Sequence, residues 1–362
     1  MKPLVGYEWP DGHTKQVAYI GQDHHVHELH VPVGGSWQHA DLTNLAGAPK
    51  AINRFLVGFA WPEAGTKQVA YVSEDGHIQE LTVRIGESWQ HADLNAITGA
   101  PPATQVTAGY SWSQGRSKQI VFVGDDGHIH ELSVVAGNSW IHADLTALTN
   151  SPLPSSRYMV GYEWAEGSSK QVAYVSQDGH IHELYLQAGR GWQHADLSML
   201  TNAPRAVDLM VGYQWREGRC KQVTFVGEDG HVHELSVGTG QPWIHTDLTA
   251  LTNAPLATNV LTGYAWEQGH TKQVAYVGQD GYIHELFVEI GGRWQEANLT
   301  SLAHAPLTSI TSMDGYAWET GGSKQVAYVG NDGDIRELWV ALGGNWQYAD
   351  LSQIVMALPV RF

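Results

Sequence analysis

KQVAYVSQDGHIHEL, residues 170–184, is the stretch that decides the fold of this chain. Its first part, with Val, Ala and Tyr, suits a buried strand, and its last part, with Ile and Leu, suits a second strand. Between them, Asp178-Gly179 predicts a tight hairpin with a type I′ turn. The first copy of the hairpin has Asp23-His24 there, so we expect a non-glycine residue in the strained turn position.

The hairpin belongs to a repeat that fills the chain. A Gly-aromatic-x-Trp motif begins at residues 6, 58, 109, 161, 212, 263 and 315, so seven units of about 52 residues follow one another. Each unit has four strand candidates, which in the fourth unit are residues 158–164, 170–176, 180–186 and 192–198. Because four short strands per unit are typical of a propeller blade, we predict an all-β fold over residues 1–362. It is a single-domain, seven-bladed β-propeller with four antiparallel strands per blade.

The ends of the units carry two further signals. The recurring pattern ADLTxLTxAP predicts an Asp-capped helical turn that ends at Pro. Ring closure stays open between two alternatives. Either the first strand, near Leu4–Trp9, completes the last blade and hides an open edge, or the two chain ends simply pack against each other.

Composition and charge limit the kinds of partner and the cellular location that we expect for this chain. The net charge is −17 with only 20 Lys and Arg, which argues against a nucleic-acid backbone as ligand, and no apolar run is long enough to enter a membrane. The N-terminus has no signal-peptide core, so we expect a cytoplasmic protein or release by a non-standard route. Cys220 is the one cysteine, which excludes an intrachain disulfide, and the oligomeric state stays open.

Four polar columns recur in every unit. Asp in the hairpin is explained by turn chemistry. Glu, three residues after the hairpin, lies mid-strand, where Glu has poor intrinsic preference. It either pairs with a Lys of the same hairpin or of the neighbouring blade, or binds ligand hydroxyls with its two oxygens. Lys and Gln alternate, so they face opposite sides of the sheet, and one of them shares a pocket with a given Glu. The lysines are at 15, 67, 118, 170, 221, 272 and 324.

Histidines form a weaker pattern. A His-x-His motif recurs in the third strand, and a further His column follows in the fourth, which could together bind zinc. The later units break these columns with Tyr282, Asp334 and Arg336, so we predict no metal site and assign these histidines to the polar surface or to support of other residues.

The order Trp, Lys-Gln-Val-x-Tyr, Asp-Gly-x-Ile-x-Glu-Leu, Gly-x-x-Trp resembles the fungal fucose-specific lectins of the Aleuria type, over essentially every unit. In that family a sugar lies in a cleft between blades, held by an Arg and a Glu of one blade and closed by a Trp of the next. The gap from Gln16 to Glu28 matches the family's Arg-to-Glu gap, so Gln stands where the family has Arg. The family propeller has six blades, whereas this chain has seven units.

The resemblance implies seven sites, each with a Gln and a Glu from one unit and a Trp from the next. They are Gln16, Glu28, Trp89; Gln68, Glu80, Trp140; Gln119, Glu131, Trp192; Gln171, Glu183, Trp243; Gln222, Glu234, Trp294; Gln273, Glu285, Trp346; and Gln325, Glu337, Trp37.

These residue types suit a sugar on physical grounds. Tryptophan covers the apolar face of a hexose, while carboxylate and amide groups bind its hydroxyls. We therefore predict a multivalent carbohydrate-binding lectin for fucose or a similar hexose, with glycans or glycoconjugates on cell surfaces as partners. The alternative is a β-propeller scaffold for protein–protein interaction. No unique nucleophile and base occur together, so we predict neither an enzyme nor a cofactor.

Overall fold

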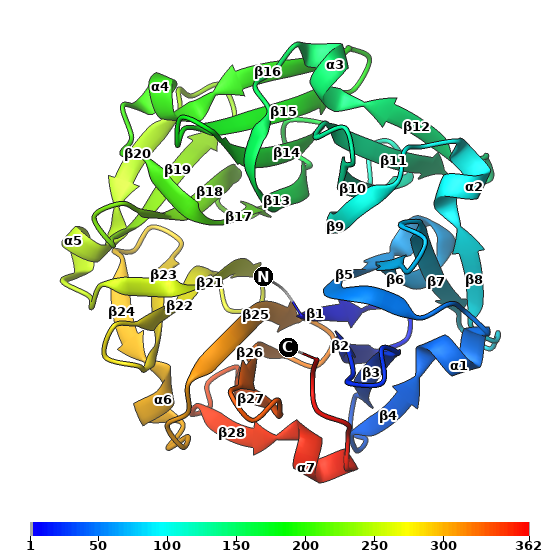
Figure 1. The fold of residues 1–362 in the computed structure, drawn as a ribbon. Helices are drawn as coiled ribbons and strands as arrows, with labels where there is room; N and C mark the ends of the chain where they lie inside the picture. Colours follow the sequence, from blue (N-terminus) through cyan, green and yellow to red (C-terminus); the bar gives the residue numbers. More distant parts are fainter. Residues whose placement is uncertain (1–2, 362) are drawn as a thin grey trace.

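The computed structural model describes residues 3–361, apart from the side chains of residues 53–54, 156–158, 208–209 and 259. Seven four-stranded antiparallel sheets form a ring, as predicted (Figure 1). Each sheet is built from one repeat unit, so we number blades 1–7 in chain order. No helix in the described part of the chain is long and apolar enough to cross a membrane.

The first strand of each blade lines the centre of the ring, and the second to fourth strands follow outward (Figure 1). The first strands are β1 (Leu4–Trp9), β5 (Ala51–Trp61), β9 (Ala103–Trp112), β13 (Pro154–Trp164), β17 (Ala206–Trp215), β21 (Ala257–Trp266) and β25 (Ile310–Trp318). The second strands are β2 (Thr14–Ile20), β6 (Thr66–Ser73), β10 (Ser117–Gly124), β14 (Ser169–Ser176), β18 (Cys220–Gly227), β22 (Thr271–Gly278) and β26 (Ser323–Gly330).

The outer half of each blade holds two shorter strands and a helical turn. The third strands are β3 (Val26–Pro32), β7 (Ile78–Arg84), β11 (Ile129–Val135), β15 (Ile181–Gln187), β19 (Val232–Gly238), β23 (Ile283–Glu289) and β27 (Ile335–Ala341). The fourth strands are β4 (Gln38–Asp41), β8 (Gln90–Asp93), β12 (Ile141–Asp144), β16 (Trp192–Asp196), β20 (Ile244–Asp247), β24 (Gln295–Asn298) and β28 (Gln347–Asp350). The helices are α1 (Leu42–Ala46), α2 (Leu94–Thr98), α3 (Leu145–Thr149), α4 (Leu197–Thr201), α5 (Leu248–Thr252), α6 (Leu299–Leu302), α7 (Leu351–Val355) and the 3₁₀ turn η1 (Pro62–Ala64).

The helical turns begin at capping residues, as the ADLT pattern predicted. In blade 2, Asp93 accepts a hydrogen bond from the Ala96 backbone N–H. Gly99 then ends α2 in the left-handed conformation, at φ 68°. A cap of this kind pairs a backbone donor that a helix of five residues would otherwise leave open.

The Asp-Gly hairpin is not the type I′ turn that the sequence predicted. In blade 2 the Gly76 N–H donates to Ser73 O at 3.0 Å, and only Gly76 has a positive φ, of 81°. A type I′ turn needs two consecutive positive φ values, whereas a type I turn followed by a left-handed glycine needs one. In blade 1, His24 takes the left-handed position at φ 69°, as expected.

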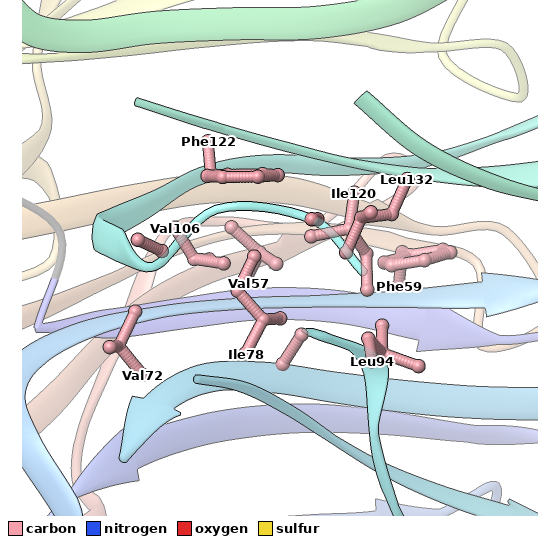
Figure 2. Packing of buried hydrophobic residues seen from close by; sticks show 12 residues of the cluster. Val57, Phe59, Val72, Ile78, Leu94, Val106, Ile120, Phe122 and Leu132 are labelled. Atoms are coloured by element: carbon pink, nitrogen blue, oxygen red, sulfur yellow. The ribbon is translucent and has the colours of Figure 1, made fainter. Parts of the chain in front are cut away.

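The core lies between blades rather than within one blade. Figure 2 shows Val57, Phe59 and Ile78 of blade 2 packed against Ile120 and Phe122 of blade 3. The Gly-aromatic motif has its physical reason here, because the aromatic ring of one blade lies on the glycine of the next. A Cβ added at Gly58 would come within 2.6 Å of the Tyr7 ring.

The ring closes without exchange of a whole strand. Each end of the chain keeps its own blade, so the N-terminal strand does not complete blade 7. Instead, Val360 forms an antiparallel bridge with Gly21 of blade 1, and its N–H donates to Gly333 O of blade 7 at 2.9 Å. At the junction of blades 2 and 3 the linker residue Ala103 makes the corresponding bond to Gly76 O. The C-terminal segment thus takes the place of a linker in blade 1.

Candidate functional site at the blade junctions

Every junction buries an ion pair between two blades. Lys67 Nζ lies 2.5 Å from Glu28 Oε1, and the two side chains are 5% and 1% exposed. Of the two roles that the sequence left open for the Glu column, the structure therefore has the pair with the Lys of the neighbouring blade. The seven pairs, 2.5–2.8 Å apart, are Lys67–Glu28, Lys118–Glu80, Lys170–Glu131, Lys221–Glu183, Lys272–Glu234, Lys324–Glu285 and Lys15–Glu337.

A tyrosine of the first strand completes the pair in several blades. Tyr162 Oη donates to Glu183 Oε1 at 3.0 Å, while Lys221 donates to both oxygens of the same carboxylate. Burial, and after it the Glu183 charge, raises the pKa of Tyr162 well above its ordinary value of 10.0. Burial lowers the pKa of Lys221, and Glu183 opposes that shift. The carboxylate thus has its hydrogen bonds filled from within the protein.

Two tryptophans enclose each lysine. Lys67 Nζ lies 5.1 Å from the ring centroid of Trp9, in the preceding blade, and 5.3 Å from that of Trp89, in its own blade. Both distances suit a cation–π contact, and Lys15 closes the ring in the same way with Trp318 and Trp37. The structure therefore brings the Glu of one blade and the Trp of the next to one junction, where the lysine contacts both.

The Gln column lies on the Glu side of the sheet, but it is fully buried. Gln16 pairs in register with Tyr7 and His30, and Glu28 is two residues from His30 on the same strand face. Gln68 Nε2 donates to the Thr66 hydroxyl. The Lys of the same hairpin faces the opposite junction, as strand alternation requires. Gln therefore orients a neighbouring hydroxyl rather than reaching the surface itself.

This hydroxyl column was missed in the sequence. The residue directly before each Lys is Ser or Thr in every unit but the fifth, which has Cys220, and that regularity was the available signal. Because Gln68 donates to Thr66, the Thr66 O–H remains able to donate to a ligand.

Polar atoms without partners recur at the junctions. In the part of the chain that the structure describes, the buried Trp61 indole N–H donates to no protein group, and the buried Gln68 amide oxygen accepts from none. The indole N–H is unpaired in all seven members of that column: Trp9, Trp61, Trp112, Trp164, Trp215, Trp266 and Trp318. Buried polar groups are usually hydrogen-bonded, so a column of unpaired donors calls for an explanation.

An open groove reaches this layer between blades 2 and 3. It has a volume of about 290 Å³ and is lined by Trp61, Thr66, Thr82, Gln90 and Lys118, among others. Gln68 and Glu80, the residues predicted from the sequence, lie behind Thr66 and Lys118 and do not line it. The groove thus offers an indole, two hydroxyls, an amide and an ammonium group to a ligand.

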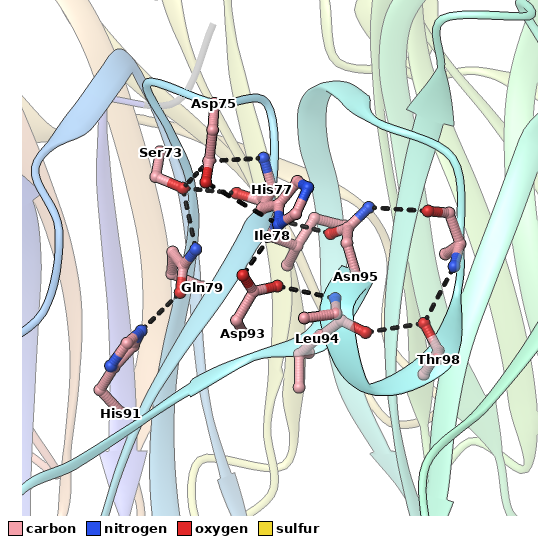
Figure 3. A network of polar contacts seen from close by, with 12 residues as sticks. Ser73, Asp75, His77, Ile78, Gln79, His91, Asp93, Leu94, Asn95 and Thr98 are labelled. Atoms are coloured by element: carbon pink, nitrogen blue, oxygen red, sulfur yellow. Dashed lines mark hydrogen bonds and ion pairs between the residues drawn. The ribbon is translucent and has the colours of Figure 1, made fainter.

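A second polar network lies at the hairpin end of each blade. In blade 2, shown in Figure 3, His77 Nδ1 lies 2.8 Å from Asp93 Oδ2, and His91 Nε2 lies 2.6 Å from Gln79 Oε1. These bonds tie the hairpin to the start of α2. The side-chain hydrogen bond to Asp93 raises the pKa of His77.

The hairpin network includes groups that could hold a cation. Among the described residues, four sets bring ligand atoms within 4.8 Å of one another: Asp23, His25, Asp41; Asp75, His77, Asp93; Asp126, His130, Asp144; and Asp229, His231, Asp247. Each of these sets is already internally hydrogen-bonded, so we assign it a structural role.

The second histidine of each His-x-His motif is buried, so of the two roles expected for these histidines it supports other residues and does not lie on the surface. His27 is 2% exposed because it stacks on Tyr19 and bonds to His39 at 3.0 Å. In blade 7, Arg336 takes this position, and its guanidinium lowers the pKa of Asp332 to about 2.

Comparison with solved structures finds proteins that have a similar fold. The chain is similar to the BP39L lectin from Burkholderia pseudomallei, with 15% identity, a TM-score of 0.68, and 95% of this chain and 97% of that chain covered. It is also similar to the fucose-specific lectin from Aleuria aurantia, with 15% identity, a TM-score of 0.53, and coverage of 82% and 93%. A mutant of the Aleuria lectin in complex with α-methyl-L-fucoside matches at 14% identity and a TM-score of 0.52, with coverage of 84% and 94%. No protein-family model and no curated protein matches the chain.

Proposed function

We propose that the chain is a multivalent lectin that binds monosaccharide units of glycans, fucose or a similar hexose, in the grooves between adjacent blades. The observation that carries the proposal is the groove between blades 2 and 3, where an indole ring, two threonine hydroxyls, an amide and a lysine line one opening. Sugar hydroxyls both donate and accept, so they can approach such groups without leaving polar atoms unpaired. The likeness in fold to lectins, one of them fucose-specific, points to the same class of ligand.

The proposal divides the work among the predicted residues. Trp61 forms one wall of the groove at the junction of blades 2 and 3, where Lys118, Thr66 and Gln90 meet the hydroxyls. Glu80 holds Lys118 in place at 2.6 Å, and Gln68 orients Thr66. Gln and Glu therefore act through the lysine and the hydroxyl, while the Trp of the next blade encloses the lysine from the other side.

Repetition compensates for weak individual sites. A shallow groove that holds one hexose gives modest affinity, because little ligand surface is buried. Several grooves on one rigid ring raise avidity by roughly 10²–10⁴ on a surface that displays many copies of the sugar. Cell-surface glycans are therefore the proposed partners.

A glycan array followed by isothermal titration calorimetry tests the proposal. We expect array binding that free monosaccharide competes away, and calorimetric binding of methyl α-L-fucoside or another methyl hexoside. Thr66→Val should lower the number of sites per chain because it removes one groove hydroxyl, whereas Thr201→Val, in α4 with its hydroxyl on Leu197 O, should not. Absence of binding to every glycan on the array would refute the proposal.

A further inference from the structure

One position at the junctions varies while its surroundings are constant. It lies two residues after the Glu, on the same strand face, and pairs in register with the buried Gln. Strand alternation therefore directs this side chain to the junction with the next blade. In chain order the residues are His30, Thr82, Ser133, Tyr185, Ser236, Phe287 and Trp339.

At two of the three aromatic positions, Tyr185 and Phe287, the ring lies against the lysine of the next blade. Lys324 Nζ is 5.5 Å from the ring centroid of Phe287, and Lys221 Nζ is 5.9 Å from that of Tyr185. At these junctions the lysine thus contacts three rings, since the two tryptophans remain in place. Phe287 stands at the register position that Thr82 holds in the groove between blades 2 and 3, so its ring takes up space that is open there.

At the junction of blades 2 and 3, where the position holds the small Thr82, the junction is open. Thr82 lines the groove of about 290 Å³ together with Lys118. Lys118 lies between Trp61 and Trp140 and is itself one of the residues that line the groove. Ser133 and Ser236 carry still smaller side chains at the same register position.

The His30 junction belongs with the filled ones. Its imidazole Nδ1 lies 3.6 Å from Glu28 Oε1, at the ion pair itself, and the side chain is 25% exposed. The ring therefore turns toward the buried pair and occupies the space beside Lys67, which Glu28 also holds.

We propose that this position decides which junctions accept a sugar. Junctions with Thr82, Ser133 or Ser236 bind a terminal hexose, and those with His30, Tyr185, Phe287 or Trp339 are closed by their own side chain. The inference rests on the proposed function and sharpens it, because it reduces seven similar junctions to three binding sites per chain.

Exchanging side chains between blades tests the inference. Thr82→Trp installs the residue that blade 7 carries at 339, and Phe287→Ser installs the residue of blades 3 and 5. Calorimetry with methyl α-L-fucoside, and in parallel with methyl β-D-galactoside and methyl α-D-mannoside, should give three sites in the unchanged chain. We expect two sites in Thr82→Trp and four in Phe287→Ser. Leu251→Trp, which introduces the same side chain at an exposed position of α5, is the control and should keep three sites.

The outcomes separate the two proposals. Binding with seven sites, or with a number that neither exchange changes, overturns the role of this position while the lectin function stands. No binding of any sugar by the unchanged chain overturns the lectin function and the inference with it. Melting curves check that each variant is folded, and Thr82→Trp keeps the test decisive if Phe287→Ser does not fold.

Discussion

Replacing Glu183 by Gln should destabilise the ring, because it removes one partner of a buried ion pair. Glu183 is 2% exposed, accepts from Tyr162 at 3.0 Å, and lies 2.6 Å from Lys221, which is 5% exposed. Removal of one partner of such a pair costs about 3–5 kcal/mol, since the other charge stays buried. Burial already lowers the pKa of Lys221, so loss of this proton in the variant limits the cost.

The cost converts into a measurable shift of the melting temperature. Unfolding entropies of about 2.1 cal/mol/K per residue give roughly 0.8 kcal/mol/K for a chain of this size, so Tm should fall by about 4–7 °C. The assay is thermal unfolding followed by circular dichroism at one protein concentration. Glu166→Gln, which removes a surface partner of Arg219, should shift Tm by less than about 1 °C, because exposed pairs contribute about 0–1 kcal/mol.

A double variant separates the interaction energy of the Glu183–Lys221 pair from the cost of burying one charge alone. Glu183→Gln with Lys221→Met removes both charges, so it should be more stable than Glu183→Gln alone. If Glu183→Gln melts like Glu166→Gln, or if the double variant loses the sum of the two single losses, the buried pair does not hold the junction as argued.

Three further changes follow from the packing and the pKa shifts. Gly58→Ala should lower the free energy of unfolding by about 1–3 kcal/mol in a urea titration, because the added Cβ meets the Tyr7 ring. Gly191→Ala, whose Cβ would have no atom within 4 Å, should lower it by less than about 1 kcal/mol. Equal losses in the two variants would contradict the packing role of Gly58. Val360→Asp places a carboxylate at a fully buried position where the C-terminal segment joins blades 1 and 7. It should lower Tm by several degrees more than Val33→Asp, which changes a 51% exposed position. Equal melting temperatures would show that the C-terminal segment does not hold the ring closed. Burial raises the pKa of Tyr7, Tyr110, Tyr162 and Tyr316. Above pH 10 the unfolded chain therefore loses protons that the folded chain keeps, and the free energy of unfolding falls by about 1.4 kcal/mol per pH unit for each tyrosine. Absorbance at 295 nm should show these tyrosines ionising only when the chain unfolds, and ionisation before unfolding would contradict their burial.

The sequence alone predicted the seven-bladed ring, because each repeat unit has the same residues at the same spacing and so shows the strand register directly. Columns such as Glu28 and its equivalents recur at fixed distances from the hairpin, so strand order and the alternation of faces could be read from one unit. The Asp cap of α2 was predictable for the same reason, since cap and helix are neighbours in the chain.

The contents of the junctions could not be predicted in the same way. Lys67 and Glu28 are 39 residues apart and meet across two blades, and a regular column does not say which member pairs with which. The predicted turn type was wrong because Asp-Gly occurs both in two-residue type I′ loops and in three-residue loops with a type I turn. Which loop forms depends on which residues make the last hydrogen-bonded pair of the two strands. Ser73 N donates to His77 O, so three residues lie in the loop and a type I turn with a left-handed Gly76 fits.

The bridge between Val360 and Gly21 makes the position of the chain ends arbitrary. Leu4 pairs with Tyr19 of β2, and Val360 bridges to Gly21, directly after the end of β2, so the two ends of the described chain lie close together along one edge. A peptide spliced between these two ends would leave a wheel of like segments, and new ends could be cut at any of the other linkers. Permuted chains of this kind should assemble the same ring, which makes the molecule a modular carrier whose sectors can be reordered or exchanged.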